Sequence, residues 1–225
     1  MTLSLTKSEK IYGGVFLLLQ MLVIPGAVTA LCIGLGIASE AAVNLICFFL
    51  NAALALWIFR RLLQQSWQNC AGRWGRTALT VLEGFGLYWL LSTAALVLIL
   101  ALRPDYANLN DASVNTMIDE FPVLMPLAVV LAAPLAEECL FRGWMFTGLA
   151  QKSLPLAYLV TAGCFSAVHL VNYIGSYDGP ALLLSLLQYL GPSLALCRTC
   201  HKSDSLLAPL LLHSLINTIA LFTTR

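Results

Sequence analysis

The chain has 225 residues, of which 60% are hydrophobic and only 10% are charged. Soluble domains carry about 25% charged residues, so 12 basic and 11 acidic side chains are too few to cover the surface of a soluble chain of this length. A disordered chain is excluded because it would be polar and charged. The net charge of +1 also gives no basic field for nucleic acid. We therefore expect an integral membrane protein with lipid around it and no nucleic-acid partner.

A transmembrane helix needs about 20 mainly apolar residues, and about seven segments of the chain meet this requirement. They predict an all-α, polytopic transmembrane helical bundle that forms a single membrane domain over residues 1–225. The last two segments are short, so six or eight spans are the alternatives. In chain order the predicted spans are 11–37, 41–59, 77–102, 121–149, 155–174, 181–197 and 206–223.

Lysine and arginine in the connecting segments predict the orientation, because cytoplasmic loops are enriched in them. With a cytoplasmic N-terminus, only Arg103 and Arg225 fall on the outer side, together with the acidic segment 103–120. The inner side then receives Lys7, Lys10, Arg60, Arg61, Arg73, Arg76, Lys152, Arg198 and Lys202. This split favours seven spans and a cytoplasmic N-terminus, with the basic stretch 60–76 as an ordinary cytoplasmic loop.

Three charged side chains fall close together inside one predicted span: Glu137, Glu138 and Arg142. A charge at the centre of a membrane helix costs about 2.5–3.5 kcal/mol on insertion scales, so these residues are candidates for function. Glu138 and Arg142 are four residues apart on a helix and can form an ion pair. Glu137 lies about 100° round the helix and is not used by that pair. A purely structural brace is the alternative, but it does not account for Glu137.

A fourth charge within the spans, Glu83, lies about 9 Å inside the third span. We expect it to reach the inner interface near Arg76, and a place near the functional site is the alternative. The sequence Cys197-x-x-Cys200-His201 matches the pattern of haem attachment, but we interpret it as a short polar loop between two spans.

Two histidines within predicted spans each share a helix face with a second side chain four residues away. Phe165 precedes His169, and Asn217 follows His213. Either histidine alone would more often be an interhelical hydrogen-bonding residue. At 1.5 Å per residue, Glu137, His169 and His213 lie about 18, 21 and 10 Å from the cytoplasmic ends of their spans. Three helices can therefore bring these groups into one cavity in the membrane interior.

This set contains the groups needed to hydrolyse a peptide bond without a covalent intermediate. Glu137 and His169 can activate water as general bases, His213 and Asn217 can donate hydrogen bonds to an oxyanion, and Arg142 can fix the glutamates. A serine nucleophile is less consistent with the sequence, because there is no G-x-S-x-G elbow. Two histidines and a carboxylate also form many catalytic zinc sites, although H-E-x-x-H is absent. The sequence does not separate these two mechanisms.

These residues resemble the motifs of the CAAX-protease and bacteriocin-processing (CPBP, or Abi) family of intramembrane endopeptidases. The family pattern is E-E-x-x-x-R, then F-x-x-x-H, then H-x-x-x-N. In this chain the three motifs occur in order over about residues 121–222, within a motif-bearing core of residues 121–223. They are Glu137-Glu138 with Arg142, Phe165 with His169, and His213 with Asn217.

The resemblance implies a glutamic-type intramembrane endopeptidase with a site that opens toward the cytoplasm. It implies that Glu137 and His169 activate water and that His213 and Asn217 form the oxyanion hole. Supporting roles fall to Glu138, Arg142 and Phe165. We expect no cofactor. A divalent metal held by Glu137, His169 and His213 is the alternative.

The expected partners are membrane lipid and a membrane-associated peptide or protein tail. Members of the family include prenyl-protein processing enzymes, peptide-maturation enzymes and self-immunity proteins against bacteriocins. The short chain resembles the bacterial branch, so we expect a multi-pass protein of a bacterial plasma membrane and assume no prenyl group on the substrate. A non-proteolytic immunity or scaffold protein is the alternative function. A transporter is disfavoured, because the chain shows no inverted repeat.

Overall fold

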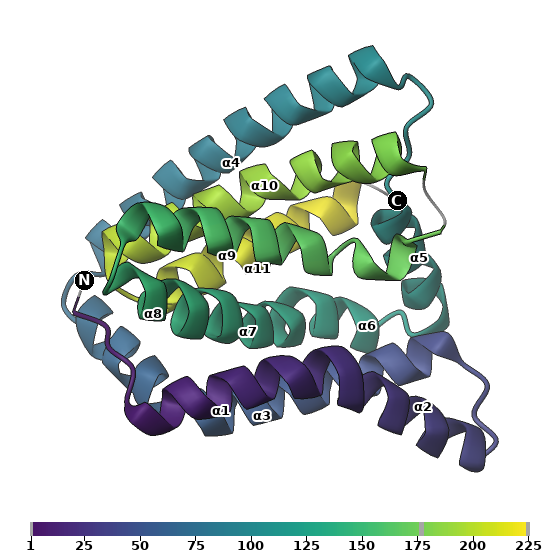
Figure 1. The fold of residues 1–225 in the computed structure, drawn as a ribbon, viewed down its shortest axis with the longest axis horizontal. Helices are drawn as coiled ribbons and strands as arrows, with labels where there is room; N and C mark the ends of the chain where they lie inside the picture. The colour runs from purple at the N-terminus through teal and green to yellow at the C-terminus, as the bar shows by residue number, and fades with distance from the viewer. Residues whose placement is uncertain (1, 176–177, 224–225) are drawn as a thin grey trace.

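The computed structural model describes residues 2–175 and 178–223, which form helices joined by turns (Figure 1). The helices run back and forth between two ends of a bundle. The N-terminus and the turns at 71–73, 151–153 and 204–206 lie at one end, which we call the N-terminal end. The opposite end contains the short helix α5, and we call it the α5 end. The predicted all-α, polytopic bundle is confirmed.

The elements follow one another with few residues between them. The first long helix consists of α1 (Lys7–Leu18), η1 (Leu19–Val23) and α2 (Ile24–Gly34), and it is followed by α3 (Glu40–Cys70), α4 (Trp74–Leu102) and α5 (Leu109–Glu120). The next long helix consists of α6 (Leu124–Leu127), η2 (Ala128–Ala132), α7 (Ala133–Glu137), η3 (Glu138–Phe146) and α8 (Thr147–Ala150). The last elements are α9 (Leu154–Val168), η4 (Val171–Tyr173), α10 (Gly179–Ser203) and α11 (Leu207–Thr223).

Five of these helices are long and apolar enough to cross a membrane: 7–34, 40–70, 74–102, 124–150 and 179–203. The helices α9 and α11 are apolar but shorter, with 15 and 17 residues. In chain order these seven helices correspond to the seven predicted spans. Their sidedness stays a prediction, and Arg225 lies outside the described residues.

Several predicted boundaries are wrong. The helix predicted over 41–59 continues to Cys70, so the connection to α4 is residues 71–73 rather than a loop over 60–76. It continues because Leu62, Ser66 and Cys70 return to the buried face every four residues. Part of the acidic segment 103–120 is helical, as α5.

The span predicted over 155–174 is too long, because α9 ends at Val168 and a 3₁₀ turn follows. The span predicted over 181–197 is too short, because α10 continues to Ser203.

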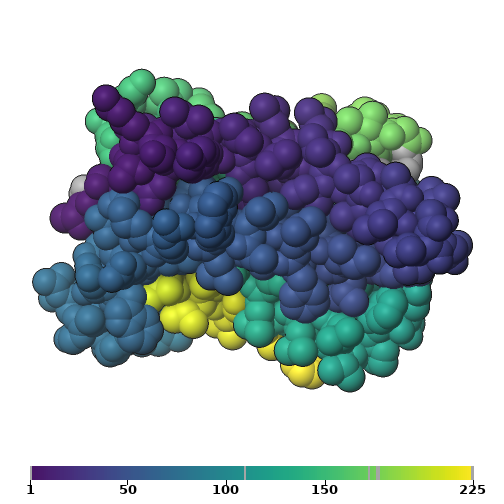
Figure 2. Space-filling model, turned by 90° about the horizontal axis from the view of Figure 1, so that it is seen from below, coloured from purple at the N-terminus to yellow at the C-terminus, as the bar shows by residue number. Residues whose placement is uncertain are grey.

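Large apolar side chains cover the outside of the bundle. Leu22, Leu159 and Phe222 are 71%, 72% and 82% exposed. Soluble proteins rarely expose contiguous apolar surface on this scale, whereas lipid solvates it. Figure 2 shows the face formed by the purple and blue N-terminal helices, with the yellow helix α11 visible beyond them. The surface fits a membrane-embedded protein.

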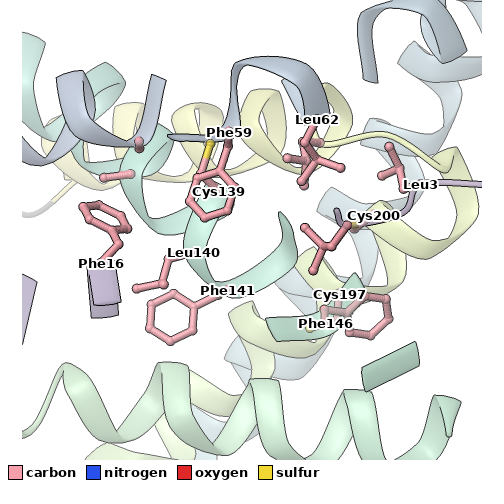
Figure 3. Packing of buried hydrophobic residues seen from close by; sticks show 14 of the residues in the cluster. Leu3, Phe16, Phe59, Leu62, Cys139, Leu140, Phe141, Phe146, Cys197 and Cys200 are labelled. Carbon is pink, nitrogen blue, oxygen red and sulfur yellow. The ribbon is translucent and has the colours of Figure 1, made fainter. Parts of the chain in front are cut away.

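The main core lies toward the N-terminal end and joins helices that are far apart in sequence (Figure 3). Phe16 of α1 packs edge-on against Phe59 of α3, with ring centroids 6.4 Å apart. Cys197 and Cys200 are fully buried in the same cluster. The C-x-x-C-H sequence is therefore part of a helix that packs in the core, and the predicted polar loop is wrong.

Ion pairs and hydrogen bonds close the N-terminal end. Glu9 caps the start of α1 and binds Arg61 of α3 at 2.5 Å. Glu83 pairs with Lys202 of α10 and not with Arg76 as expected. These contacts hold α1, α3, α4 and α10 together beside the core.

Candidate active site

The helix that carries Glu137 contains two π-helical segments, η2 and η3, on either side of the short α7. Such segments are rare and occur often at functional sites. The hydroxyl of Thr147, the first residue of α8, donates to the carbonyl of Arg142 in η3 at 2.8 Å. In η2 the carbonyl of Val129 accepts a hydrogen bond from the amide of Asn217 on α11 at 2.9 Å. The irregular backbone thus ties α11 to this helix.

Glu138 and Arg142 form a fully buried ion pair, with Arg142 Nη1 2.9 Å from Glu138 Oε1. The pair that the i, i+4 spacing predicts is therefore present. Arg142 Nη2 also donates to the Ser193 hydroxyl at 2.9 Å and to the Ser193 carbonyl at 3.2 Å. Its guanidinium carbon lies 4.4 Å from the centre of the Phe165 ring. Arg142 therefore connects its own helix to both α9 and α10.

His213 of α11 lies between the two glutamates. Its Nδ1 is 2.8 Å from Glu138 Oε1, and its Nε2 is 3.8 Å from Glu137 Oε2. An ionised carboxylate can only accept hydrogen bonds, so Nδ1 carries the hydrogen in that contact. Glu138 therefore fixes the tautomer of His213 and turns Nε2 toward Glu137.

Glu137 is the carboxylate that the Arg142 network does not use. Its Oε2 is buried and has no hydrogen-bond partner among the described residues. The 3.8 Å separation from His213 is too long for a direct hydrogen bond. Glu138 Oε2 also lacks a partner, so Glu137 is distinguished by its place in the cavity lining and by the lack of an ion pair with Arg142.

His169 follows the last residue of α9 and is held by its own helix. Its Nδ1 is 2.8 Å from the Phe165 carbonyl oxygen, so Nδ1 donates and Nε2 is left as the acceptor. The imidazole stacks on Tyr189 of α10 with ring centres 4.6 Å apart, and Phe165 flanks it at 4.5 Å. These contacts fix the ring plane of the histidine.

One cavity of about 640 Å³ brings the predicted residues together. Glu137, His169, His213 and Asn217 all line it. Phe165 also lines it, whereas the Glu138–Arg142 pair is buried behind its wall. The four residues proposed for catalysis thus line the cavity together with Phe165, whereas Glu138 and Arg142, the other two residues proposed for support, lie outside it.

The cavity extends from these residues to the α5 end. Its lining includes Asn108, Asp111 and Met117 from α5 and the residue before it, and Glu40 from the start of α3. With a cytoplasmic N-terminus, this end faces the outer side. The predicted orientation and the cytoplasmic opening implied by the resemblance thus point to opposite ends of this cavity, and both stay predictions.

The residues do not fit a preformed metal site. Within residues 2–175 and 178–223, no three His, Cys, Asp or Glu side chains are grouped so that they could hold a metal ion. The Nδ1 contacts of His213 with Glu138 and of His169 with a backbone carbonyl leave Nε2 as the ring atom that could bind a metal. Glu137, His169 and His213 share a cavity, but they are not arranged as a ligand set.

Sequence reasoning missed three residues of this site: Val129, Tyr189 and Ser193. Val129 has no polar side chain, and its contribution depends on the π-helical backbone. Ser193 follows Pro192, a proline inside a long apolar helix, and that unusual position was the available signal. Tyr189 lies in an apolar segment, where a tyrosine is typical of an interfacial or interhelical position, so its sequence context gives no signal for the site.

The fold and the buried network define a polytopic helical membrane protein with a cluster of charged and polar side chains inside the bundle. Residues 119–219 match the family described as Type II CAAX prenyl endopeptidase Rce1-like. Over 123 residues the chain is 26% identical to the UPF0177 protein YxdF of Lactococcus lactis subsp. lactis (strain IL1403), covering 53% of this chain and 67% of that protein. No solved structure matches. The predicted kinship with the CPBP family is confirmed.

Proposed function

We propose that this chain is a glutamic-type intramembrane endopeptidase that hydrolyses a peptide bond in a membrane-associated peptide or protein tail. One observation carries the proposal. Glu137, His169, His213 and Asn217 line one cavity, whereas Glu138 and Arg142 neutralise each other behind it. The cavity therefore contains a carboxylate that is not held in an ion pair with arginine.

Glu137 and His169 activate the attacking water in this proposal. The unpartnered Oε2 of Glu137 accepts one proton of the water. His169 offers Nε2 as a second acceptor, because its Nδ1 donates to the Phe165 carbonyl. The oxygen of the water forms a bond to the carbonyl carbon of the substrate while its proton passes to Glu137.

Asn217 and His213 stabilise the oxyanion that forms on the substrate. The Asn217 amide has two N–H groups, one of which donates to Val129, so the second is free for the oxyanion. His213 donates from Nε2 when it is protonated, because Glu138 already occupies Nδ1. Removing one such donor typically lowers kcat by 10²–10³-fold. Glu137 then gives its proton to the leaving nitrogen, and the peptide bond breaks.

The substrate enters the cavity from the membrane or from the α5 end, and no cofactor is part of the mechanism. The apolar side chains in the lining, such as Phe48, Leu96 and Ile216, fit an apolar peptide segment. The polar residues of α5 fit a more polar part of the same chain. No prenyl group on the substrate is needed for this fit.

The test uses the purified protein in lipid nanodiscs with a mixed library of apolar peptides, and mass spectrometry reads the cleavage. We expect Glu137→Gln and His169→Ala to lower the rate by about 10²–10⁴-fold, the range for general acid–base groups. Glu83→Gln is the matched control, because Glu83 pairs with Lys202 and does not line the cavity. Cleavage at the wild-type rate by folded Glu137→Gln would contradict the site. A wild-type protein that cleaves no peptide would instead support the non-proteolytic alternative.

A further inference from the structure

The cavity contains a second polar region at the α5 end, away from the residues that act on the peptide bond. Its lining there includes Asn108, Asn110 and Asp111 at the start of α5, and Gln188 and Tyr189 on α10. The proposed mechanism uses none of these side chains. They share a continuous cavity with Glu137 and His169, so a single peptide can contact both regions.

The charges along the cavity all have one sign when the histidines are neutral. Its described lining residues include the carboxylates of Glu40, Asp111 and Glu137, and no lysine or arginine. Arg103, which precedes α5 in the chain, is held by Asp178 at 3.0 Å and faces Asp105 at 3.6 Å. The cavity therefore has a negative potential that favours a cationic ligand.

Asp111 is half-buried and lacks a cationic partner. Its side chain forms a hydrogen bond with Asn108, and it forms no ion pair with the part of the chain that the structure describes. Burial raises the pKa of Asp111 above its ordinary value. A positive charge bound beside such a carboxylate stabilises its ionised form.

A chain of contacts connects Asp111 to the catalytic histidine. The Asn108 side chain that binds Asp111 also accepts a hydrogen bond from the Tyr189 hydroxyl at 3.4 Å. The Tyr189 ring stacks on His169 at 4.6 Å. A ligand group bound at Asp111 is therefore held in a fixed relation to His169.

The other half of α5 anchors this arrangement. Met117 and Ile118 are buried in an apolar cluster with Leu45 of α3 and Met125 of α6. Asp111 lies in the first turn of the same helix, and the cavity lining extends along the helix from Asp111 to Met117. The helix thus places the carboxylate rigidly at the wall.

We propose that Asp111 forms a specificity subsite that binds a cationic group of the peptide substrate, either a lysine or arginine side chain or a free amine. The subsite rests on the proposed peptidase function and adds a charge preference to it. The rest of the substrate would lie along the apolar wall toward Glu137. A neutral apolar peptide without this cation would bind more weakly.

The experiment compares two peptides that differ at one position, lysine in one and norleucine in the other. The position is moved along an apolar peptide in nanodiscs until cleavage is fastest. We expect the wild type to prefer the lysine peptide by about tenfold in kcat/KM, the size of one charge-assisted hydrogen bond. Asp111→Asn should abolish the preference. Asp105→Asn, in the same segment but absent from the cavity lining, should retain it.

Two further measurements keep this proposal separate from the peptidase proposal. Binding of the same labelled peptides to Glu137→Gln, read by fluorescence anisotropy, should show the same lysine preference without cleavage. On the wild type alone, a glutamate peptide should be a worse ligand than a glutamine peptide. The subsite proposal is overturned, and the peptidase proposal stands, if the wild type cleaves peptides without any charge preference. The same holds if Asp111→Asn retains the preference for lysine. If the preference in binding persists but no peptide is cleaved, the peptidase proposal fails and the subsite stands.

Discussion

His213 Nδ1 lies 2.8 Å from Glu138 Oε1, and this contact joins α11 to the helix that carries both glutamates. The same oxygen accepts the 2.9 Å hydrogen bond from Arg142. Glu138 is therefore more than the partner of an arginine. It sets which nitrogen of His213 faces the cavity, in the way that the aspartate of a serine protease orients its catalytic histidine.

The first prediction concerns Glu138 as a positioning residue. Glu138→Gln keeps the shape of the side chain but weakens its hold on His213, so kcat should fall by about 10- to 100-fold, while KM changes by less than about twofold. Glu138→Asp should recover part of kcat, because it restores the charge. Steady-state kinetics on the purified protein measure both values.

Ser193→Ala is the matched control for this prediction. It removes a different hydrogen bond of Arg142 and leaves His213 untouched. We expect a lower unfolding temperature and an unchanged kcat. A Glu138→Gln protein with wild-type kcat, or a Ser193→Ala protein with an equal loss, would contradict the positioning role.

The second prediction concerns metal dependence. Glu137, His169 and His213 are not arranged as a ligand set among the described residues, and the proposed chemistry needs none. Hydrolysis should therefore continue at the same rate after dialysis against EDTA and in the presence of 1,10-phenanthroline. Elemental analysis of the active protein checks the metal content directly. Loss of activity with the chelator, and recovery with one divalent ion, would favour the metal-dependent mechanism.

Sequence patterns predicted contacts within one helix better than contacts between helices. The i, i+4 spacing predicted the pairing of Glu138 with Arg142, because that relation depends on one helix alone. The contact of Ser193 with Arg142 depends on how α10 packs, and no local pattern encodes it. The same holds for α5, whose Ile118 is buried by helices distant in sequence. Membrane spans were recognisable from hydropathy, but their ends depend on tertiary contacts such as those of Cys70.

The third prediction tests how α4 packs on α10. A Cβ atom added at Gly191 would lie 3.0 Å from the Cβ of Leu91 and 3.4 Å from the backbone nitrogen of Ser92. Gly191→Ala should therefore destabilise the bundle by about 1–2 kcal/mol, because the cost of overpacking exceeds the stability that alanine adds to a helix relative to glycine. Unfolding in mixed micelles measures the difference.

Gly86→Ala is the control on the partner helix. A Cβ atom there would meet nothing within 4 Å, so the variant should be as stable as the wild type or more stable by about 0.5–1 kcal/mol. Equal destabilisation of both variants would show that close packing at Gly191 does not limit stability.

The fourth prediction concerns Asp204, which joins the N-terminal segment to the turn before α11. One carboxylate oxygen accepts from the Thr2 hydroxyl at 2.5 Å and from the Thr2 backbone at 2.6 Å, and the other accepts from Leu3 at 3.1 Å. Burial alone would raise the pKa of Asp204, but these hydrogen bonds outweigh it and hold the pKa below the ordinary value of 3.8. The ionised form therefore stabilises the folded protein.

Because the folded pKa of Asp204 is depressed, its stabilising effect is fully present above about pH 4 and is lost as the pH falls through the lower folded pKa. Asp204→Asn should thus unfold more easily than the wild type at neutral pH, by about 1 kcal/mol. The difference should shrink as the pH falls below 3.8. Asparagine tolerates the left-handed backbone at this position, where φ is 51°, so the substitution adds no backbone strain.

The control is Asp105→Asn, which removes a carboxylate from an exposed ion pair and should change stability by less than about 0.5 kcal/mol. A difference for Asp204→Asn that stays constant down to the lowest pH would contradict the role of its charge.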